Sequence, residues 1–323
     1  MILGDRDDEF LAAALQAMRG PGDLALESLG FWDLVPELDD RDARAAVFAS
    51  FRAQGRALAC SRGLGGILAQ PFIEGSPIVP GSVLAAIPRT SRRRGLVWTL
   101  VGDADDRAVL FDLPGNGTYV VPAGDIERHR VEVAGRATVH ELTVDLASHQ
   151  PFLTDDLARP ARRRSTYLGR MALASEMLGA SEQVVAMAVE YAGIREQFGQ
   201  PIGVFQAVRH LLAWADTDCA AIDSAIRHGV RQLSEAPEHF GAAIKALAGR
   251  NARKACERSL QVFGGVGFTE EHDHHHFHSR VLALDALLGS SSELTHSLGS
   301  WLRTTSTDPA FAAAVLVATE QPI

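Results

Sequence analysis

Cysteine is scarce in this sequence and lacks the spacing of a metal site or a disulfide framework. The 323 residues include three cysteines, Cys60, Cys219 and Cys256, which are far apart and odd in number. No Cys-x-x-Cys pair occurs. These features argue against a small disulfide-stapled fold and against a zinc-ribbon type of site. They favour reduced thiols, and we therefore expect a cytoplasmic protein.

Basic residues are also fewer than acidic ones. Lysine and arginine number 31 against 40 aspartates and glutamates, which gives a formal net charge of -9. The basic residues form no stripe with interleaved aromatics, so the sequence does not indicate a nucleic-acid-binding surface. Two arginine triplets, at 92–94 and 162–164, are the exceptions. We interpret both as solvated charges of loops and helix starts rather than as phosphate-binding sites.

Long apolar runs are missing as well. The longest, residues 311–318, is much too short to cross a bilayer, and the acidic start at residues 1–10 does not resemble a signal peptide. Hydrophobic residues nevertheless make up 46% of the chain, which is enough to bury a large core. The sequence therefore predicts a globular protein without a membrane segment.

Hydrophobic spacing divides the chain into three parts. Apolar residues recur at helical intervals from about residue 9 to 70, short β-branched runs follow between about 83 and 146, and helical spacing returns from about 158. No βαβ alternation is present, which favours an α+β fold. We expect an N-terminal helical domain (1–80), a reduced β domain (81–148) and a C-terminal four-helix bundle (149–323). The bundle helices are predicted near 165–193, 203–233, 238–263 and 281–303.

Two motifs lie at predicted helix ends in the C-terminal half. One starts at Arg195 and reads Arg-Glu-Gln-Phe-Gly-Gln-Pro-Ile; the other starts at Gln261 and reads Gln-Val-Phe-Gly-Gly-Val-Gly-Phe-Thr. An arginine at a helix end can offer a planar fork of donors to a pyrophosphate, and paired glycines let backbone amides approach phosphate oxygens. The same residues also suit a simpler role, in which the arginine caps helix carbonyls and the glycine pair ends a helix.

Together these motifs resemble those of the acyl-CoA dehydrogenases. The first is similar to the family's Arg-x-x-Phe-Gly segment and the second to its Gln-x-x-Gly-Gly-x-Gly signature, in the expected order over roughly the last half of the chain. The resemblance implies an acyl-CoA dehydrogenase-like fold, an acyl-CoA substrate and FAD at a subunit interface. It also implies which residues would contact an FAD held mainly by the neighbouring chain: Arg195, Gln197, Phe198, Gln206, Gln261, Gly264 and Gly265.

The sequence departs from the family at the catalytic base. The reaction removes a proton next to the thioester, which requires a carboxylate. Leu288 stands where the family commonly has the glutamate of a Glu-Gly-Thr segment. Some members instead place the base on the long helix, and that position falls at about Gly169 here. Glu176 and Glu293 are the remaining substitutes, and we interpret each as a solvated or helix-capping carboxylate. We therefore predict no catalytic residue in this chain.

A second departure lies in the β region. Family members that hold their own flavin carry a Thr-Glu-Pro-like segment and a Trp-Ile-Thr or Trp-Ile-Ser strand that lies against the flavin ring. Residues 87–90 (Ile-Pro-Arg-Thr) and 97–99 (Val-Trp-Thr) resemble these segments only weakly. We therefore expect the side chains that would hold a flavin ring in this chain to be missing.

A histidine-rich run spans residues 272–278. Imidazoles can ligate zinc or nickel, but adjacent histidines on a helix point in different directions, and no spaced carboxylate or thiolate completes a ligand set. We predict a structural role for this run and no metal site.

The whole pattern resembles the small partner subunits of bacterial acyl-CoA dehydrogenases that form α2β2 tetramers, especially those that act on CoA thioesters of steroid side chains and rings. We expect such a chain to be flavin-free by itself and to complete the FAD site of a catalytic acyl-CoA dehydrogenase subunit. Two alternatives stay open. One is a self-sufficient homo-oligomeric dehydrogenase that uses Glu176 or Glu293, and the other is a scaffold of the same fold that has lost FAD.

Overall fold

The computed structural model describes residues 4–91, 95–102, 107–231 and 239–304. The arginine triplet at 92–94 and the apolar run at 311–318 lie outside these residues. In the second triplet, Arg162 donates to the Asp112 carboxylate at 2.7 Å and Arg164 donates to the Asp39 carboxylate at 2.9 Å. The interpretation of this triplet as solvated charge was wrong for Arg162, because its guanidinium is largely buried in an ion pair.

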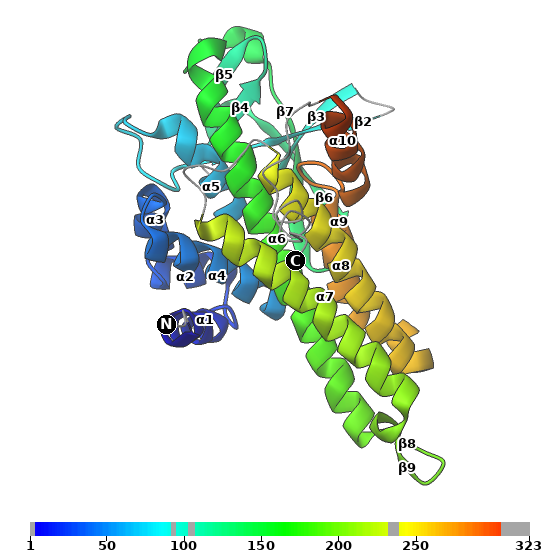
Figure 1. The fold of residues 1–323 in the computed structure, drawn as a ribbon. Coiled ribbons are helices and arrows are strands. Elements are labelled where there is room, and N and C mark those ends of the chain that lie inside the picture. Colours follow the sequence, from blue (N-terminus) through cyan, green and yellow to red (C-terminus); the bar gives the residue numbers. More distant parts are fainter. Residues whose placement is uncertain (1–3, 92–94, 103–106, 232–238, 305–323) are drawn as a thin grey trace, which may run out of the picture.

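Short helices form the N-terminal part (Figure 1). They are α1 (Gly4–Ala17), α2 (Gly22–Ser28), α3 (Phe31–Leu34), the 3-10 helix η1 (Val35–Glu37), α4 (Arg41–Ala57) and α5 (Gly63–Ile73). Helix α4 begins where the polar run predicts a start, because the Asp40 carboxylate accepts hydrogen bonds from the backbone N–H groups of Asp42 and Ala43, both at 2.9 Å. Helix α5 is buried along nearly its whole length and packs on α6 and β1.

The β region consists of two small sheets. The strands are β1 (Val83–Ala85), β2 (Ile87–Ser91), β3 (Gly95–Val101), β4 (Ala108–Leu113), β5 (Gly117–Val121), β6 (Glu127–Val133) and β7 (Ala137–Thr143), with 3-10 turns η2 (Ala123–Asp125) and η3 (Leu146–Ser148). Their order is β1-β4-β5 in one sheet and β2-β3-β7-β6 in the other. Between β4 and β5 the chain turns at Asn116, whose N–H donates to the Leu113 carbonyl at 2.9 Å. Trp98 and Phe111 fill the core of this region, edge to face at 5.1 Å.

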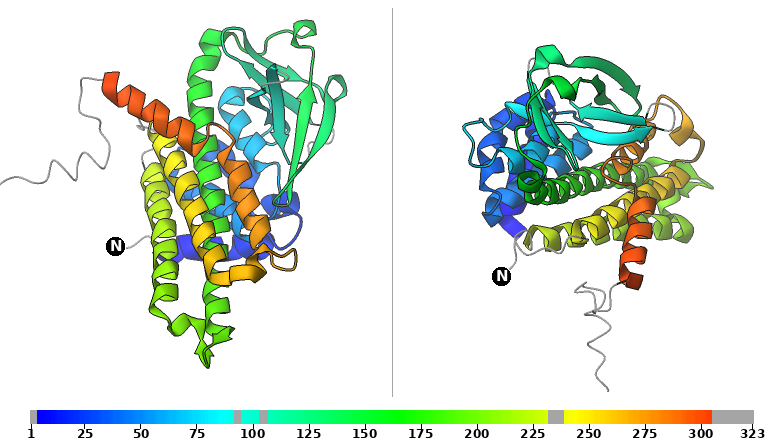
Figure 2. Two further views of the ribbon diagram at one scale, coloured as in Figure 1. Left: turned by 90° about the vertical axis from the view of Figure 1, so that its right-hand side faces the viewer. Right: turned by 90° about the horizontal axis from the view of Figure 1, so that it is seen from above.

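A helical bundle follows the β region. It contains α6 (Asp155–Ile194), α7 (Gln206–Arg231), α8 (Phe240–Phe263), α9 (His274–Asp285) and α10 (Ser291–Thr304), with the short connections β8 (Glu196–Gln197), β9 (Gln200–Pro201), η4 (Ile202–Val204) and η5 (Gly264–Phe268). Helix α6 is the central element: it separates the β region from α7 and α8 (Figure 2) and contacts α4, α5, α7, α8 and α9. No helix in the described ranges is long and apolar enough to cross a membrane.

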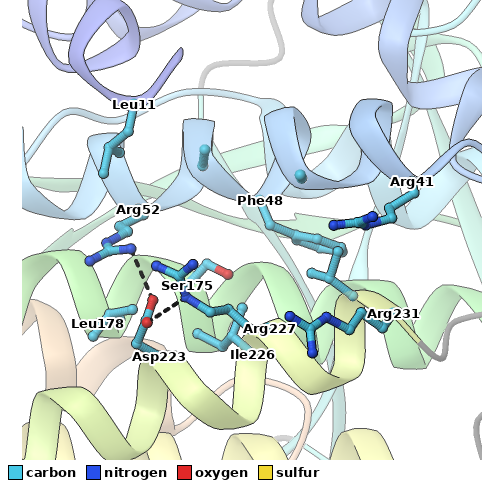
Figure 3. A pocket seen from close by; sticks show the side chains of 13 residues that line it. Leu11, Arg41, Phe48, Arg52, Ser175, Leu178, Asp223, Ile226, Arg227 and Arg231 are labelled. Carbon is cyan, nitrogen blue, oxygen red and sulfur yellow. Dashed lines mark hydrogen bonds and ion pairs between the residues drawn. The ribbon is translucent and has the colours of Figure 1, made fainter. Parts of the chain in front are cut away.

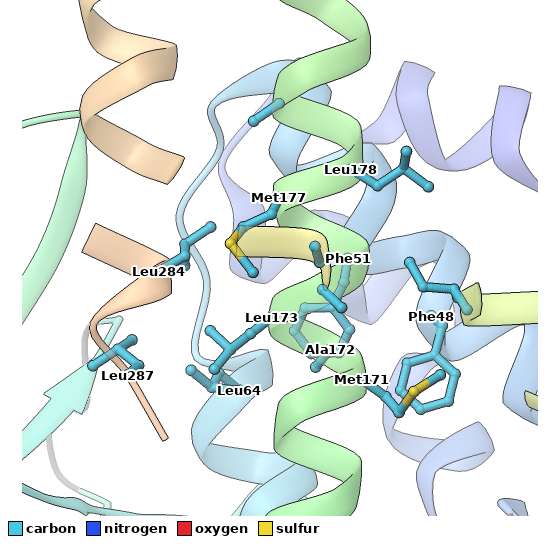
Figure 4. Packing of buried hydrophobic residues seen from close by; sticks show 14 of the residues in the cluster. Phe48, Phe51, Leu64, Met171, Ala172, Leu173, Met177, Leu178, Leu284 and Leu287 are labelled. Atoms are coloured by element: carbon cyan, nitrogen blue, oxygen red, sulfur yellow. The ribbon is translucent and has the colours of Figure 1, made fainter. Parts of the chain in front are cut away.

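Glycines at their crossing let α4 and α6 approach closely. A Cβ atom added to Gly179 of α6 would lie within 1.9 Å of the Arg52 carbonyl oxygen, and one added to Gly55 of α4 would lie within 2.0 Å of the Glu176 carbonyl oxygen. Larger side chains above and below this crossing fill the core around α6, among them Met171 and Phe48 (Figure 4). The two helices therefore form one rigid unit, since neither glycine can be enlarged without moving backbone.

The predicted helix over 281–303 was wrong, because the chain forms two helices there. Helix α9 ends at Asp285 and α10 begins at Ser291. Leu288 and Gly289 between them have positive φ angles of 52° and 94°, which no right-handed helix accommodates. The turn is closed by a capping box: the Ser290 N–H donates to the Glu293 carboxylate at 2.8 Å, and the Glu293 N–H donates back to the Ser290 hydroxyl at 3.3 Å.

Candidate functional site

Both sequence motifs lie at the same end of the bundle, where β8 and β9 protrude in Figure 1. Helix α6 ends at Arg195, whose N–H donates to the Tyr191 carbonyl at 2.8 Å, and the turn returns so that the Ile202 N–H donates to the Arg195 carbonyl at 2.7 Å. The second motif ends α8. The rings of Tyr191 and Phe263 meet at 5.6 Å and connect the two helix ends. The fold thus brings together segments that are about 65 residues apart in the sequence.

The predicted cofactor contacts at this end face outward. The side chains of Arg195, Gln197, Gln206 and Gln261 are exposed. Throughout the four described ranges, no carboxylate pairs with the Arg195 guanidinium and no helix carbonyl accepts from it. Only the backbone of Arg195 caps α6, so the simpler interpretation as a side-chain cap has no hydrogen bond to support it. The guanidinium remains available to a ligand outside the chain.

Phe198 is unusual in both exposure and backbone. Its ring is 94% exposed, and its φ angle is 55°, in the left-handed region that bulky residues rarely adopt. Ile194, at the end of α6, and Phe268, in the second motif, are also exposed, at 72% and 77%. A cluster of exposed apolar side chains at one end of a molecule is typical of an interaction surface. The backbone strain at Phe198 supports an interaction surface too, because strained residues are often found at functional sites.

Gly264 and Gly265 leave their backbone open to a ligand. Gly264 ends α8 with a φ of 64°, and a Cβ atom added to either glycine would meet nothing within 4 Å. Backbone N–H groups at such a position can approach phosphate oxygens without steric hindrance. The exposed arginine, the amides and the glycine pair are groups that can donate hydrogen bonds to an anion such as a pyrophosphate.

Both positions predicted for a catalytic base lie side by side. A Cβ atom added to Gly169 would lie 2.6 Å from Cδ1 of Leu288 and 2.5 Å from Cδ2 of Leu68. Gly169 is on α6, whereas Leu288 is in the turn between α9 and α10. The place that a base could occupy from either element therefore contains packed leucine side chains. A carboxylate at Gly169 would require both leucines to move.

Lys245 fixes the turn that carries Leu288. This side chain is fully buried on α8, and its ammonium donates to the carbonyl oxygens of Asp285 at 2.9 Å and Gly289 at 2.6 Å. Burial lowers the pKa of Lys245 to about 8, although the nearby Asp285 carboxylate opposes that change. Sequence analysis missed this residue. The available signal was a single lysine in the middle of an otherwise small and apolar helix face.

Because Lys245 is buried, we expect the free energy of unfolding to depend on pH in the alkaline range as well as in acid, where proteins usually lose stability. Between pH 8 and 10.5 the unfolded chain, in which lysine has its ordinary pKa of 10.5, holds more protons than the folded chain. The free energy of unfolding should therefore rise with pH across this window, by on the order of 3 kcal/mol from Lys245. Urea unfolding at both ends of the window measures it, and in Lys245→Met this part of the rise should vanish. Equal slopes in both proteins would contradict the assignment.

Glu176 is buried, so its interpretation as a solvated or capping carboxylate was wrong. One oxygen accepts from Nη1 of Arg280 at 2.8 Å and the other from Nε2 of Gln54 at 2.8 Å. Arg280 also donates to the carbonyl oxygens of Gly135 at 2.8 Å and Arg136 at 2.9 Å, in the turn between β6 and β7. Burial raises the pKa of Glu176, and Arg280 opposes that rise. The pair links α6, α4, α9 and the β region in one network.

The remaining sequence candidates have structural contacts. Glu293 is exposed and caps α10, and the hydrogen bonds from Ser290 lower its pKa. Trp98 is 6% exposed and packs against Phe111, so its indole is part of the β core. In the histidine run, ring Nε2 of His274 lies 2.9 Å from the Cys256 carbonyl. Among the residues that the structure describes, no three His, Cys, Asp or Glu side chains are grouped to hold a metal ion.

Comparison with known proteins gives the family. Residues 161–300 match the model of the acyl-CoA dehydrogenase C-terminal domain. The chain is 34% identical to the acyl-CoA dehydrogenase FadE34 of Mycobacterium tuberculosis over 223 residues, which are 67% of this chain and 29% of that protein. It is 38% identical to the acyl-CoA dehydrogenase IpdE2 of the same organism over 129 residues, 40% of this chain and 39% of that one. The matched segments thus span well under half the length of these two relatives.

Solved structures show the same fold. A variant of the Tcur3481–Tcur3483 steroid ACAD superposes with a TM-score of 0.74 and 19% identity, over 94% of this chain and 99% of that one. A chain of the ChsE4-ChsE5 complex from Mycobacterium tuberculosis gives a TM-score of 0.70 and 20% identity, over 95% and 99%. Residues 161–300 are thus an acyl-CoA dehydrogenase C-terminal domain, and the chain has the acyl-CoA dehydrogenase fold.

Proposed function

We propose that this chain is a non-catalytic subunit of an FAD-dependent acyl-CoA dehydrogenase and completes the flavin site of a catalytic partner. The observation that carries the proposal is the contact between Gly169 and Leu288 at both positions where a base is expected. The α,β-dehydrogenation of an acyl-CoA needs a carboxylate that reaches the carbon next to the thioester. Packed leucines cannot accept that proton, so the partner supplies the base.

The bundle end supports the shared cofactor. FAD, when bound, accepts the hydride of the reaction. In this proposal Arg195 donates to the pyrophosphate, the amides of Gln197, Gln206 and Gln261 add hydrogen bonds, and the open backbone at Gly264 and Gly265 admits the phosphate oxygens. In the same proposal the exposed ring of Phe198 packs against the partner subunit. These contacts serve an FAD held by the neighbouring subunit, because Trp98 of this chain is buried in its own β core.

Two of the similar structures support a proposal for the partner and the substrate class. One of them is a complex of two different chains and another is a steroid ACAD. We propose an α2β2 assembly with a catalytic acyl-CoA dehydrogenase subunit, acting on a bulky acyl-CoA such as a steroid thioester. The geometry of the two substitute carboxylates counts against a self-sufficient enzyme. Glu176 is 3% exposed and held by Arg280, and Glu293 caps a helix.

Co-expression with a catalytic acyl-CoA dehydrogenase subunit tests the proposal. We expect the chain made alone to be flavin-free and the purified pair to carry FAD. A stoichiometrically flavinylated homo-oligomer would support the self-sufficient enzyme instead. A pair that forms without any flavin would support the scaffold.

A separate measurement addresses the base. In the assembled complex, Glu293→Gln should leave turnover nearly unchanged, because this carboxylate only caps α10. Removal of a true general base costs about a hundred- to ten-thousand-fold. Steady-state kinetics of the variant decide the question, and a loss on that scale would assign the base to this chain.

A further inference from the structure

A cavity of about 90 Å³ lies between α1, α4, α6 and α7, away from the site described above. Leu178 of α6 lines it, and this residue is nine positions from Gly169. At 3.6 residues per turn, nine positions place the two on opposite sides of the helix. The cavity therefore neither overlaps the position of the missing base nor belongs to the bundle end with the sequence motifs.

Regular helix faces build the cavity walls. From α4, Arg41, Ala45 and Ala49 lie four residues apart and share one face, and from α7, Ile226 and Val230 do the same. Phe48 and Leu178 contribute buried apolar surface. The cavity remains open because the side chains of Ala45 and Ala49 on α4 and of Ser175 on α6 are small. Ser175 is the small residue of α6, and its hydroxyl is satisfied by the Met171 carbonyl at 2.9 Å.

Arginines surround this apolar floor (Figure 3). At one end, Asp223 accepts from Nη1 of Arg52 at 3.0 Å and from Nε of Arg227 at 2.6 Å. At the other end, Arg41 and Arg231 reach in from opposite walls beside Phe48. Within the described part of the chain, neither of these two guanidinium groups has a carboxylate partner.

The cavity has an excess of positive charge. Four guanidinium groups line it against the single carboxylate of Asp223, in a chain whose net charge is -9. A cavity with apolar walls and excess positive charge concentrates anions. The two unpaired arginines can bind one carboxylate or phosphate head group through charge-assisted hydrogen bonds. Cations and uncharged polar molecules gain nothing comparable here.

We propose that this cavity binds an amphiphilic anion, namely an acid head group on a short alkyl chain. The head group binds Arg41 and Arg231, and the alkyl chain lies along Phe48, Ile226 and Val230. An apolar cavity of about 150 Å³ holds one benzene molecule, so this cavity, at about 90 Å³, admits an alkyl chain of roughly three carbon atoms. This binding site is independent of the proposed cofactor contact and goes beyond it.

Calorimetric titration of butyrate into the full chain tests the proposal. We expect butyrate to bind with one-to-one stoichiometry and more tightly than acetate, which lacks the alkyl chain, or butanol, which lacks the charge. Arg41→Gln and Arg231→Gln should each weaken butyrate binding by about tenfold or more, since each removes a charge-assisted hydrogen bond. Ala49→Leu should weaken it as well, because the larger side chain fills the cavity without changing charge.

Arg19→Gln is the matched control, because Arg19 is an exposed arginine outside the cavity. It should leave butyrate affinity unchanged, and all four variants should keep the thermal midpoint of the unliganded wild type. The proposal is overturned if butyrate does not bind, if acetate binds as tightly, or if the cavity variants bind butyrate as the wild type does.

Discussion

Replacing Arg280 with methionine should lower the free energy of unfolding by about 3–5 kcal/mol, the usual result of removing one partner from a buried ion pair. Arg280 is 1% exposed, and the carboxylate of Glu176, 3% exposed, would lose its charged partner. The carbonyl oxygens of Gly135 and Arg136 would lose their donor too. Denaturant unfolding monitored by circular dichroism measures the change.

Two controls separate the ion pair from general damage. Arg253→Met removes an arginine whose pair with Glu257 is exposed, and it should change stability by less than about 1 kcal/mol. The double variant Glu176→Leu with Arg280→Met should recover part of the loss, because no buried charge is then left alone. If Arg280→Met were as stable as Arg253→Met, the buried network would not be a main support of the fold.

Arg195→Ala should weaken FAD binding by the assembled complex by about ten- to a hundredfold. The estimate follows from the loss of charge-assisted hydrogen bonds worth about 1.5–3 kcal/mol. The partner subunit would lose flavin although it carries no mutation. Arg195→Lys should restore only part of the affinity, because an ammonium keeps the charge but lacks the planar fork. FAD titration into the apo-complex, followed by flavin fluorescence, measures each dissociation constant.

Arg159→Ala is the control for that titration, since Arg159 is an exposed arginine near the opposite end of α6. It should bind FAD as the wild type does. If Arg195 served only the helix end, Arg195→Ala would lower the thermal midpoint and leave the FAD dissociation constant unchanged, which would contradict a contact across the interface.

Local patterns in the sequence predicted the parts of the fold that depend on local contacts. The Asp40 cap, the turn at Asn116 and the long helix before Arg195 follow from residues that are neighbours in the chain. The position at Gly169 could be counted back from the first motif because α6 is one uninterrupted helix from Asp155 to Ile194, where that motif begins. The division into domains at residues 80 and 148 stays a prediction.

Features that depend on distant residues could not be predicted in this way. Glu176 is paired with a residue 104 positions later, and nothing in its own helix distinguishes it from a surface glutamate. The break at Leu288 depends on Lys245, which holds the turn from another helix. The cavity at Arg41 and Arg231 requires four helices to meet. Each of these needs the tertiary arrangement, because periodicity records only which face of an element is buried.

The ratio of flavin to protein in the purified complex tests the central claim most directly. If this chain completes a partner's site and has none of its own, the complex should contain one FAD for each pair of unlike chains. Flavin released by denaturation and measured by absorbance, against subunit amounts from quantitative amino-acid analysis, gives the ratio. Two FAD molecules for each pair would show that this chain holds a flavin of its own and would contradict the account.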